Sequence, residues 1–321
     1  MNRPQSVANP QGQGQNMSSA ARALVQNMGK ALVGQSKSAK LAVVALIAGG
    51  HVLLEDVPGV GKTLLAKSLS NSIKGNFKRI QCTPDLLPSD VSGVNVYDQK
   101  EGVFKFVPGP IFTNILLVDE INRATPRTQS SLLEAMEEGQ VTSDGTTRQL
   151  PPLFFVIATQ NPIEHHGTFP LPEAQLDRFM ISMSLGYPQS DMEGEIIKKS
   201  LQEGSFNVDS ILSVEDVIAA KQAAKKIFVH DALVNYIVQI VQATRKNPSI
   251  LLGVSPRGSG LLVRAAQALA FVDGRDFVTP DDIKVLAPCV FGHRVVPKVK
   301  TNRVSHGELI EKIVETIPVP A

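Results

Sequence analysis

The sequence has 321 residues, of which 43% are apolar, and its formal net charge is +2. A chain of this length is long enough for one large domain or two ordinary ones, and we expect two. The charge is spread evenly along the chain, so neither half has the basic excess typical of a dedicated nucleic-acid-binding protein. Only Cys82 and Cys289 occur, which excludes a disulfide framework and a cysteine-based zinc site.

Membrane insertion and secretion are not indicated by the sequence. The longest apolar run covers residues 41–48 and is far shorter than a bilayer span. The N-terminus has no cationic segment that leads into an apolar stretch. These features predict a cytoplasmic protein without a membrane span.

The first segment of the chain, residues 1–17, is rich in Gln, Asn, Gly, Pro and Ser, which predicts a mobile tail. Helices are predicted over residues 19–28 and 36–48, and the second should end at the glycines 49–50. The connection between these helices contains the triplet Val33–Gly34–Gln35.

Short β-rich runs then alternate with helical patterns, which predicts a parallel sheet covered by helices on both faces. The runs cover residues 51–55, 79–83, 115–119, 153–158 and 180–185. Such sheets hold ligands at the carboxyl ends of their strands. We therefore expect an α/β core over residues 18–187.

After residue 188 the strands give way to helical patterns, in which apolar residues recur at spacings of three and four. These patterns cover residues 192–202, 214–225, 231–245, 257–271, 280–286 and 308–316. They predict a second, smaller domain over residues 188–321 that is entirely helical.

The most informative segment, residues 51–63, joins an apolar strand to a helix through a glycine-containing turn. Gly59 and Gly61 lack a Cβ, so backbone N–H groups can surround phosphate oxygens at the N-terminus of the helix, where the dipole favours negative charge. Lys62 is predicted to reach the β and γ phosphates, and the Thr63 hydroxyl is predicted to ligate Mg²⁺. The predicted cofactor-binding residues of this segment are Pro58, Gly59, Val60, Gly61, Lys62, Thr63 and Leu64.

This match to a phosphate-binding loop is imperfect. The usual pattern, G-x-x-x-x-G-K-[ST], has a glycine where this chain has Asp56. A strand, turn and helix with an ordinary surface lysine is the alternative interpretation.

Polar residues also follow two other apolar strands. Asp119 and Glu120 follow residues 115–118, so one carboxylate can hold the Mg²⁺ shell while its neighbour orients or deprotonates an attacking water. Asn161 follows residues 153–158, where an amide can hold a water against the γ-phosphate. The alternatives are solvated acids at the end of a strand and an asparagine in a turn.

Five segments between residues 53 and 180 occur in an order typical of one family: Leu-Leu-Glu-Asp-Val-Pro-Gly-Val-Gly-Lys-Thr, Leu-Leu-Val-Asp-Glu-Ile-Asn-Arg-Ala, Ser-Leu-Leu-Glu-Ala-Met-Glu-Glu, Ala-Thr-Gln-Asn-Pro and Leu-Pro-Glu-Ala-Gln-Leu-Asp-Arg-Phe. In these segments the chain resembles the AAA+ ATPases, and within them the MoxR family. Asp56 fits the pattern of this family, and the helical remainder fits its lid domain.

The resemblance implies a P-loop ATPase that uses ATP and Mg²⁺. It implies that Lys62 and Thr63 form the Walker A pair and that Thr63 and Asp119 hold the metal. Asp119 and Glu120 would form the Walker B pair, with Asn161 as the sensor 1 residue.

Two arginines take roles from the same resemblance. Arg178 falls where related proteins place an arginine finger for the neighbouring subunit, because a planar, permanently charged guanidinium matches phosphoryl oxygens. A salt bridge to Asp177 or Glu173 is the alternative. Arg257 resembles sensor 2, which reaches back from the second domain to the γ-phosphate; otherwise it is an arginine in the first turn of a helix, where the dipole disfavours a cation.

Three further segments have less specific predicted roles. Val33–Gly34–Gln35 resembles the segment that passes the adenine, although a plain connection fits equally well. Residues 85–110 resemble the helix 2 insert of this clade, and residues 141–150 are predicted to form a β-hairpin. These two elements could move with the nucleotide state and contact a client protein; the alternative is that they are rigid surface features. His165 and His166 have too few ligand neighbours for a metal site.

The resemblance implies a homo-hexameric ring that acts as a chaperone on partner proteins, thought in this family to bear a von Willebrand factor A domain. We find no such domain in the sequence, so the partner would be encoded separately.

A nucleic-acid motor is one alternative, but residues 85–110 hold four acidic residues against two lysines. A nucleotide-gated scaffold with little turnover is the other, and the presence of Glu120 beside Asp119 argues against it. A GTPase is disfavoured because the chain lacks an Asn-Lys-x-Asp motif.

Overall fold

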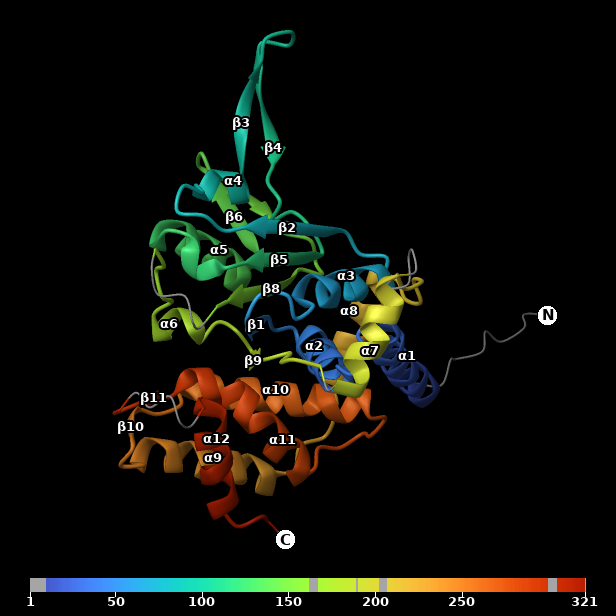
Figure 1. Ribbon diagram of the computed structural model, residues 1–321, viewed down its shortest axis with the longest axis vertical. Helices are drawn as coiled ribbons and strands as arrows, with labels where there is room; N and C mark the ends of the chain where they lie inside the picture. The colour runs from blue at the N-terminus through green and yellow to red at the C-terminus, as the bar shows by residue number, and fades with distance from the viewer. Residues whose placement is uncertain (1–9, 162–166, 189, 202–206, 300–304, 321) are drawn as a thin grey trace, which may run out of the picture.

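The computed structural model describes residues 10–161, 167–188, 190–201, 207–299 and 305–320. Its centre is a five-stranded parallel sheet (Figure 1). The strand order is β2 (Phe77–Gln81), β5 (Ile115–Asp119), β8 (Phe155–Gln160), β1 (Val52–Glu55) and β9 (Ile181–Met183). The predicted parallel sheet is therefore confirmed, although β2 begins two residues before its predicted start and β8 two residues after.

Alternate residues of the central strands enter two separate hydrophobic cores. Leu54 and Leu117 belong to a core that includes residues of α2 (Ser36–Ala48) and α3 (Lys62–Ser72). Leu53 and Leu116, which point to the opposite face, pack with α5 (Pro126–Glu138). Because both faces are buried, these strands appear in the sequence as continuous apolar runs.

The second half of the chain is mainly helical. Its helices are α7 (Ser190–Ser200), α8 (Val214–Ala224), α9 (Asp231–Lys246), α10 (Pro256–Val272), α11 (Pro280–Phe291) and α12 (His306–Thr316). Helices α9 to α12 lie together below β9 in Figure 1, whereas α8 packs on the two N-terminal helices, α1 (Pro10–Ala31) and α2. We call α9 to α12 the lid.

The lid differs from the prediction in two respects. A short antiparallel pair, β10 (Ile250–Leu252) with β11 (Val296–Pro297), is added to the helices that were expected alone. The hydrophobic core of the lid is also continuous with the core that α1 and α2 form on the sheet. The domain boundary at residues 187–188 stays a prediction.

In the part of the chain that the structure describes, no helix has the length and apolarity needed to cross a membrane.

Helix α1 corrects the predicted N-terminal tail. Residues 10–17 belong to this helix, which extends beyond the predicted range of 19–28 in both directions. Its apolar residues Met17, Ala21, Leu24 and Met28 recur at helical spacing and pack on the core, which stabilises the helix despite its polar composition. The rest of the predicted tail lies outside the described residues.

Two hairpins stand beside the sheet. The first follows α4 (Pro88–Ser92) and pairs β3 (Gly93–Asp98) with β4 (Val103–Pro108), extending well away from the core (Figure 1). The second pairs β6 (Gln140–Ser143) with β7 (Thr146–Gln149), which confirms the hairpin predicted at residues 141–150. Arg148 of β7 stacks on Phe106 of β4, 3.7 Å from the ring centroid, so the second hairpin supports the base of the first.

The buried His51 predicts a dependence of stability on pH. Its Nδ1 accepts from the N–H of Val156 at 3.0 Å, and its Nε2 lies 3.1 Å from the carbonyl oxygen of Met136. Burial lowers the pKa of His51 to about 4. Below the unfolded-state pKa of about 6.5, the unfolded chain binds a proton that the native protein does not, so stability falls as the pH drops from 6.5 towards 4.

We expect this residue to lower the free energy of unfolding by about 2 kcal/mol between pH 7 and pH 5. Urea denaturation at the two pH values would measure the change. In a His51→Gln protein the decrease should be smaller by about that amount. An equal decrease in both proteins would show that His51 is not responsible.

Candidate active site

The turn between β1 and α3 has the backbone conformation of a phosphate-binding loop. Gly59 and Gly61 have φ values of +89° and +101°, in the left-handed region that favours glycine. A Cβ at Gly59 would meet no atom within 4 Å, so the dihedral angle, and not the available space, requires glycine there. Helix α3 begins at Lys62, whose Nζ donates to the carbonyl oxygen of Asp56 at 3.0 Å.

A pocket of about 210 Å³ opens at the carboxyl ends of the strands. Its lining residues are Pro58, Gly59, Gly61, Lys62, Thr63, Arg79, Gln81, Asp119, Glu120, Thr159 and Asn161. The structure thus brings together the predicted Walker A, Walker B and sensor 1 residues from three separate segments of the chain. Val60 and Leu64, also predicted as cofactor-binding, are not among the lining residues; Val60 is buried and Leu64 is half-buried on α3.

Asp119 is held by two side chains that the sequence analysis did not single out. Its Oδ1 accepts from the hydroxyl of Thr159 at 3.2 Å, and its Oδ2 accepts from Nε of Arg79 at 2.6 Å. The same Thr159 hydroxyl oxygen accepts from the backbone N–H of Glu120 at 2.9 Å. One threonine at the end of β8 therefore fixes both members of the acidic pair.

Glu120 has a strained backbone and an anchored carboxylate. Its φ of +55° is left-handed, which costs a non-glycine residue about 1 kcal/mol or more. Its Oε2 accepts from Nε2 of Gln81 at 2.9 Å and from Nη1 of Arg123 at 3.1 Å. Strain of this kind clusters at functional sites, where the surrounding contacts hold the residue in place.

The signal for Arg79 and Gln81 was present in the sequence. They are two residues apart near the end of β2, so they lie on the same side of a strand whose neighbour is β5. Polar side chains at this spacing beside a strand that ends in Asp119 could have been assigned to the pocket. Arg123 and Thr159 carried no comparable pattern.

The donor set of the pocket fits Mg²⁺. The Thr63 hydroxyl and the Asp119 carboxylate line the same pocket, and Mg²⁺ prefers oxygen donors and is usually bound through few protein ligands together with substrate phosphates. Across the described ranges, no group of three or more His, Cys, Asp or Glu residues could hold a metal by itself. The histidines at 165 and 166 lie outside those ranges.

The nearby cysteine offers no further chemistry. Burial, with contributions from Asp119 and Glu120, raises the pKa of Cys82 to about 12. Its thiol is therefore protonated at neutral pH, which makes it a poor nucleophile.

Asp56, the departure from the general loop pattern, connects the loop to the segment after β9. Its carboxylate accepts from the Ser184 hydroxyl at 2.6 Å and from the N–H groups of Leu185 and Gly186 at 2.6 and 3.2 Å. A glycine at this position could not make these bonds. The loop is thus joined to the segment that leads toward the lid.

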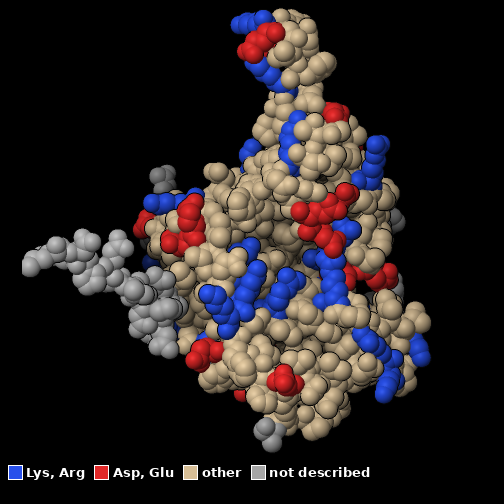
Figure 2. Space-filling view, turned by 180° about the vertical axis from the view of Figure 1, so that it is seen from behind, with Lys and Arg blue, Asp and Glu red and all other residues tan. Residues whose placement is uncertain are grey.

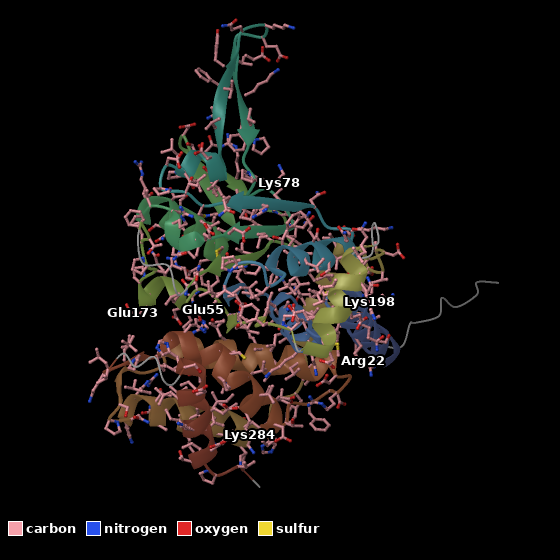
Figure 3. All side chains as sticks on the ribbon, in the orientation of Figure 1. Arg22, Glu55, Lys78, Glu173, Lys198 and Lys284 are labelled. Atoms are coloured by element: carbon pink, nitrogen blue, oxygen red, sulfur yellow. The ribbon has the colours of Figure 1, made fainter. Side chains whose placement is uncertain are left out.

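The adjacent Glu55 ties three strand ends together. Its carboxylate oxygens accept from Nε2 of Gln160 on β8 and from the hydroxyl of Ser182 on β9, both at 2.6 Å. Figure 3 shows Glu55, the last residue of β1, near the middle of the molecule. These bonds fix the edge of the sheet from which the loop emerges.

The triplet Val33–Gly34–Gln35 lies against the loop, as the adenine-passing role requires. Nε2 of Gln35 donates to the carbonyl oxygen of Val60 at 3.2 Å. Gly34 has a left-handed φ of +75° between α1 and α2. The three residues are not among those that line the pocket, so their contact with adenine stays a prediction.

Arg178 and Arg257 lie next to each other, outside the pocket of their own chain. Nε of Arg178 is 3.2 Å from Oε2 of Glu137, and Nη1 of Arg257 is 2.6 Å from Oε1 of the same residue. Arg257 is not among the residues that line the pocket, so its predicted reach to the γ-phosphate stays a prediction. Arg178 pairs with Glu137 on α5 rather than with Asp177 or Glu173, and Asp177 is paired with Arg294 at 2.7 Å.

Comparisons with known proteins agree with this geometry. Residues 51–181 match the family model described as ATPase family associated with various cellular activities, and residues 242–313 match the AAA lid domain. YeaC of Bacillus subtilis is 50% identical over 92% of this chain and 93% of its own. Chaperone MoxR1 of Mycobacterium tuberculosis is 42% identical over 90% of this chain and 79% of its own.

A solved structure supports the same assignment. The crystal structure of a candidate ATPase from Cytophaga hutchinsonii has a TM-score of 0.90 and 36% sequence identity to this chain, and the match covers 97% of this chain and 98% of the other. A parallel sheet with a glycine loop, an acidic pair and a helical lid defines an ATPase of the AAA+ class. The chain belongs to the MoxR family of these ATPases.

Proposed function

We propose that this protein hydrolyses ATP in a homo-hexameric ring and uses the cycle to remodel or mature partner proteins. The observation that carries the proposal is the convergence of five residues of complementary chemistry on one pocket. These residues are Lys62, Thr63, Asp119, Glu120 and Asn161. Phosphoryl transfer requires mainly positioning and electrostatic stabilisation, which such a pocket provides.

In the proposed reaction, water attacks the γ-phosphorus of ATP and the bond to the bridging oxygen of ADP breaks. Glu120 orients the water and accepts its proton, and Asn161 holds the water in line. Lys62 and the loop N–H groups bind the phosphate oxygens. Thr63 and Asp119 would hold Mg²⁺, which supplies positive charge to the phosphate oxygens.

We propose that Arg178 and Arg257 complete the pocket of the adjoining subunit. Neither residue is among those that line the pocket of its own chain, and their side chains are 28% and 42% exposed. Their partner Glu137 is 39% exposed, so this ion pair is weak enough to exchange for a phosphate. Ring assembly would then place both cations at a neighbouring triphosphate.

The β3–β4 hairpin is the proposed client-binding element. Exposed apolar side chains cover both of its faces: Val94, Val96, Tyr97, Val103, Phe104 and Val107. Phe104 alone is 70% exposed. Exposed apolar groups of this kind are typical of protein-binding surfaces.

The charges at the tip of this hairpin disfavour a nucleic-acid partner. Lys105 is paired with Asp98 at 2.8 Å and with Glu101. Figure 2 shows acidic and basic side chains next to each other at the tip. A surface that follows phosphates would present unpaired cations.

A capture experiment tests the proposed chaperone role. A Glu120→Gln protein, which should accumulate the ATP-bound state, is expected to retain a partner with a von Willebrand factor A domain when incubated with cell extract and ATP. Adding Val96→Thr and Phe104→Thr, which keep β propensity but remove exposed apolar surface, should lower recovery about tenfold. Mass spectrometry of the bound proteins provides the measurement.

The matched control for this experiment is Val285→Thr on α11, an exposed apolar position in the lid. It should leave recovery unchanged. Equal recovery with and without the hairpin substitutions would contradict the client-binding role of β3–β4. Recovery of no protein partner would contradict the chaperone role itself. The cytoplasmic location and the hexameric ring remain predictions.

A further inference from the structure

The segment that carries Arg178 is held by a buried arginine from the lid. Arg294, at the end of the short helix η2 (Gly292–Arg294) that follows α11, has a side chain only 1% exposed. Its Nε donates to Oδ1 of Asp177 at 2.7 Å, and its Nη2 donates to the carbonyl oxygens of Asp177, at 3.0 Å, and of Phe179. The backbone on both sides of Arg178 is therefore fixed by one guanidinium.

The same carboxylate also contacts the helix that carries Arg257. Oδ2 of Asp177 accepts from the hydroxyl of Ser255 at 3.3 Å. Ser255 is the N-cap of α10, and its hydroxyl oxygen accepts from the N–H of Gly258 at 3.2 Å. Asp177 therefore joins the segment of Arg178 to the first turn of α10, where Arg257 lies.

The two arginines are thus fixed at both ends. Asp177 and Arg294 hold the backbone from which they extend, and Glu137 receives both guanidinium groups at the surface. Burial lowers the pKa of Arg294 to about 10, against the opposing effect of Asp177, so its guanidinium is charged at neutral pH. Apolar residues often stabilise a fold as well as a buried ion pair does, so stability alone does not account for this pair.

We propose that Asp177 and Arg294 are positioning residues through which the lid sets the placement of Arg178 and Arg257 at the pocket of the adjoining subunit. The inference rests on the proposed action of these arginines between subunits. A movement of the lid would shift both cations together, because Arg294 and Ser255 belong to the lid segment and meet at Asp177. Misplacement of a catalytic group by about 1 Å can cost a hundredfold in rate.

Mixed rings provide a test that separates positioning from folding. A Lys62→Ala subunit can donate both arginines but binds ATP poorly, whereas an Arg178→Ala subunit binds ATP but cannot donate Arg178. Each variant alone should be nearly inactive. When the two are mixed in equal amounts, the rings should recover roughly one quarter of the wild-type rate, because an interface is productive only where the pocket of an Arg178→Ala subunit meets a Lys62→Ala neighbour. Asp177→Asn is then added to the donor or to the acceptor.

We expect Asp177→Asn to lower the recovered rate about tenfold or more in the donor and less than about twofold in the acceptor. Ser255→Ala should also lower the recovered rate more in the donor than in the acceptor, but by a smaller factor. It replaces Asp177→Asn in this test if Asp177→Asn does not fold. Asp282→Asn is the matched control, because Asp282 is buried and pairs with Arg275 at 2.6 Å elsewhere in the lid. It should have equal effects in both subunits.

Equal losses from Asp177→Asn in donor and acceptor, or no loss in either, would overturn the positioning role while leaving the shared pocket intact. Suppose that the two parent proteins recover no activity when mixed, although both form rings and the acceptor binds ATP. The proposed action of Arg178 at the neighbouring pocket would then be wrong, and the positioning role, which depends on it, would be wrong too. The two failures are therefore distinguishable within one set of measurements.

Discussion

Replacement of Glu120 by glutamine is expected to lower ATP hydrolysis by about 10²- to 10⁴-fold, the range that a general base contributes. Glutamine keeps the shape of the side chain and can still bond to Gln81, but it cannot accept a proton from water. ATP binding should change little, because the loop and Lys62 are unaltered. Phosphate release and ATP binding, measured on the same preparation, would show the separation.

The control for this variant is Glu134→Gln, an exposed position on α5, which should hydrolyse ATP at the wild-type rate. This comparison also decides between an ATPase and a nucleotide-gated scaffold. If the protein were a scaffold, the wild-type protein would release little phosphate, and Glu120→Gln would not change that rate. Loss of ATP binding in step with hydrolysis would contradict the assignment of Glu120 to the chemical step.

Arg178→Ala is expected to lower hydrolysis by about 10³-fold, at the lower end of what an arginine finger contributes. The physical reason is the loss of a fixed cation beside charge that develops on the transferring phosphoryl group. Arg178→Lys should recover only part of this loss, since an ammonium lacks the planar fork. Steady-state phosphate release at saturating ATP would measure all three proteins.

Arg127→Ala, which removes an exposed arginine from α5, is the control and should be nearly neutral. Sedimentation would establish that each variant assembles as the wild-type protein does. An Arg178→Ala protein that forms rings and hydrolyses ATP at the wild-type rate would refute the arginine finger.

The sequence was most informative where chemistry and backbone conformation coincide. The glycine turn could be located because Gly59 and Gly61 need left-handed dihedral angles, and the acidic pair could be located because Asp119 ends a wholly buried strand. Since the carboxyl ends of parallel strands share one edge of the sheet, Asn161 was also expected near the loop. The pocket confirms that these residues converge.

The contacts of the lid could not be predicted in this way. Periodicity identified α10 and placed Arg257 in its first turn, but it gives no information on how α10 sits against the core. The structure shows Arg257 on Glu137, and the partners Asp177 and Arg294 are 117 positions apart in the sequence. Such pairs are set by tertiary packing, for which a single sequence carries no local signal.

The β3–β4 hairpin was missed for a different reason. Residues 85–110 were recognised as an insert by their length, but apolar residues occur on both faces of the hairpin, so the alternation that marks a half-buried strand is weak. Its base is set by the close approach of Gly93 to Val107 and of Gly109 to Val91. Exposure of apolar groups on both faces is better explained by binding than by folding.

Calorimetric titration of ATP in the presence of Mg²⁺ tests the central claim most directly, because every step above depends on one triphosphate pocket built around Lys62. The wild-type protein should bind ATP with measurable heat, and Lys62→Ala should weaken that binding by about a hundredfold or more through loss of a charge-assisted contact to phosphate. A wild-type protein that gives no heat with ATP, or a Lys62→Ala protein that binds and cleaves it normally, would contradict the account.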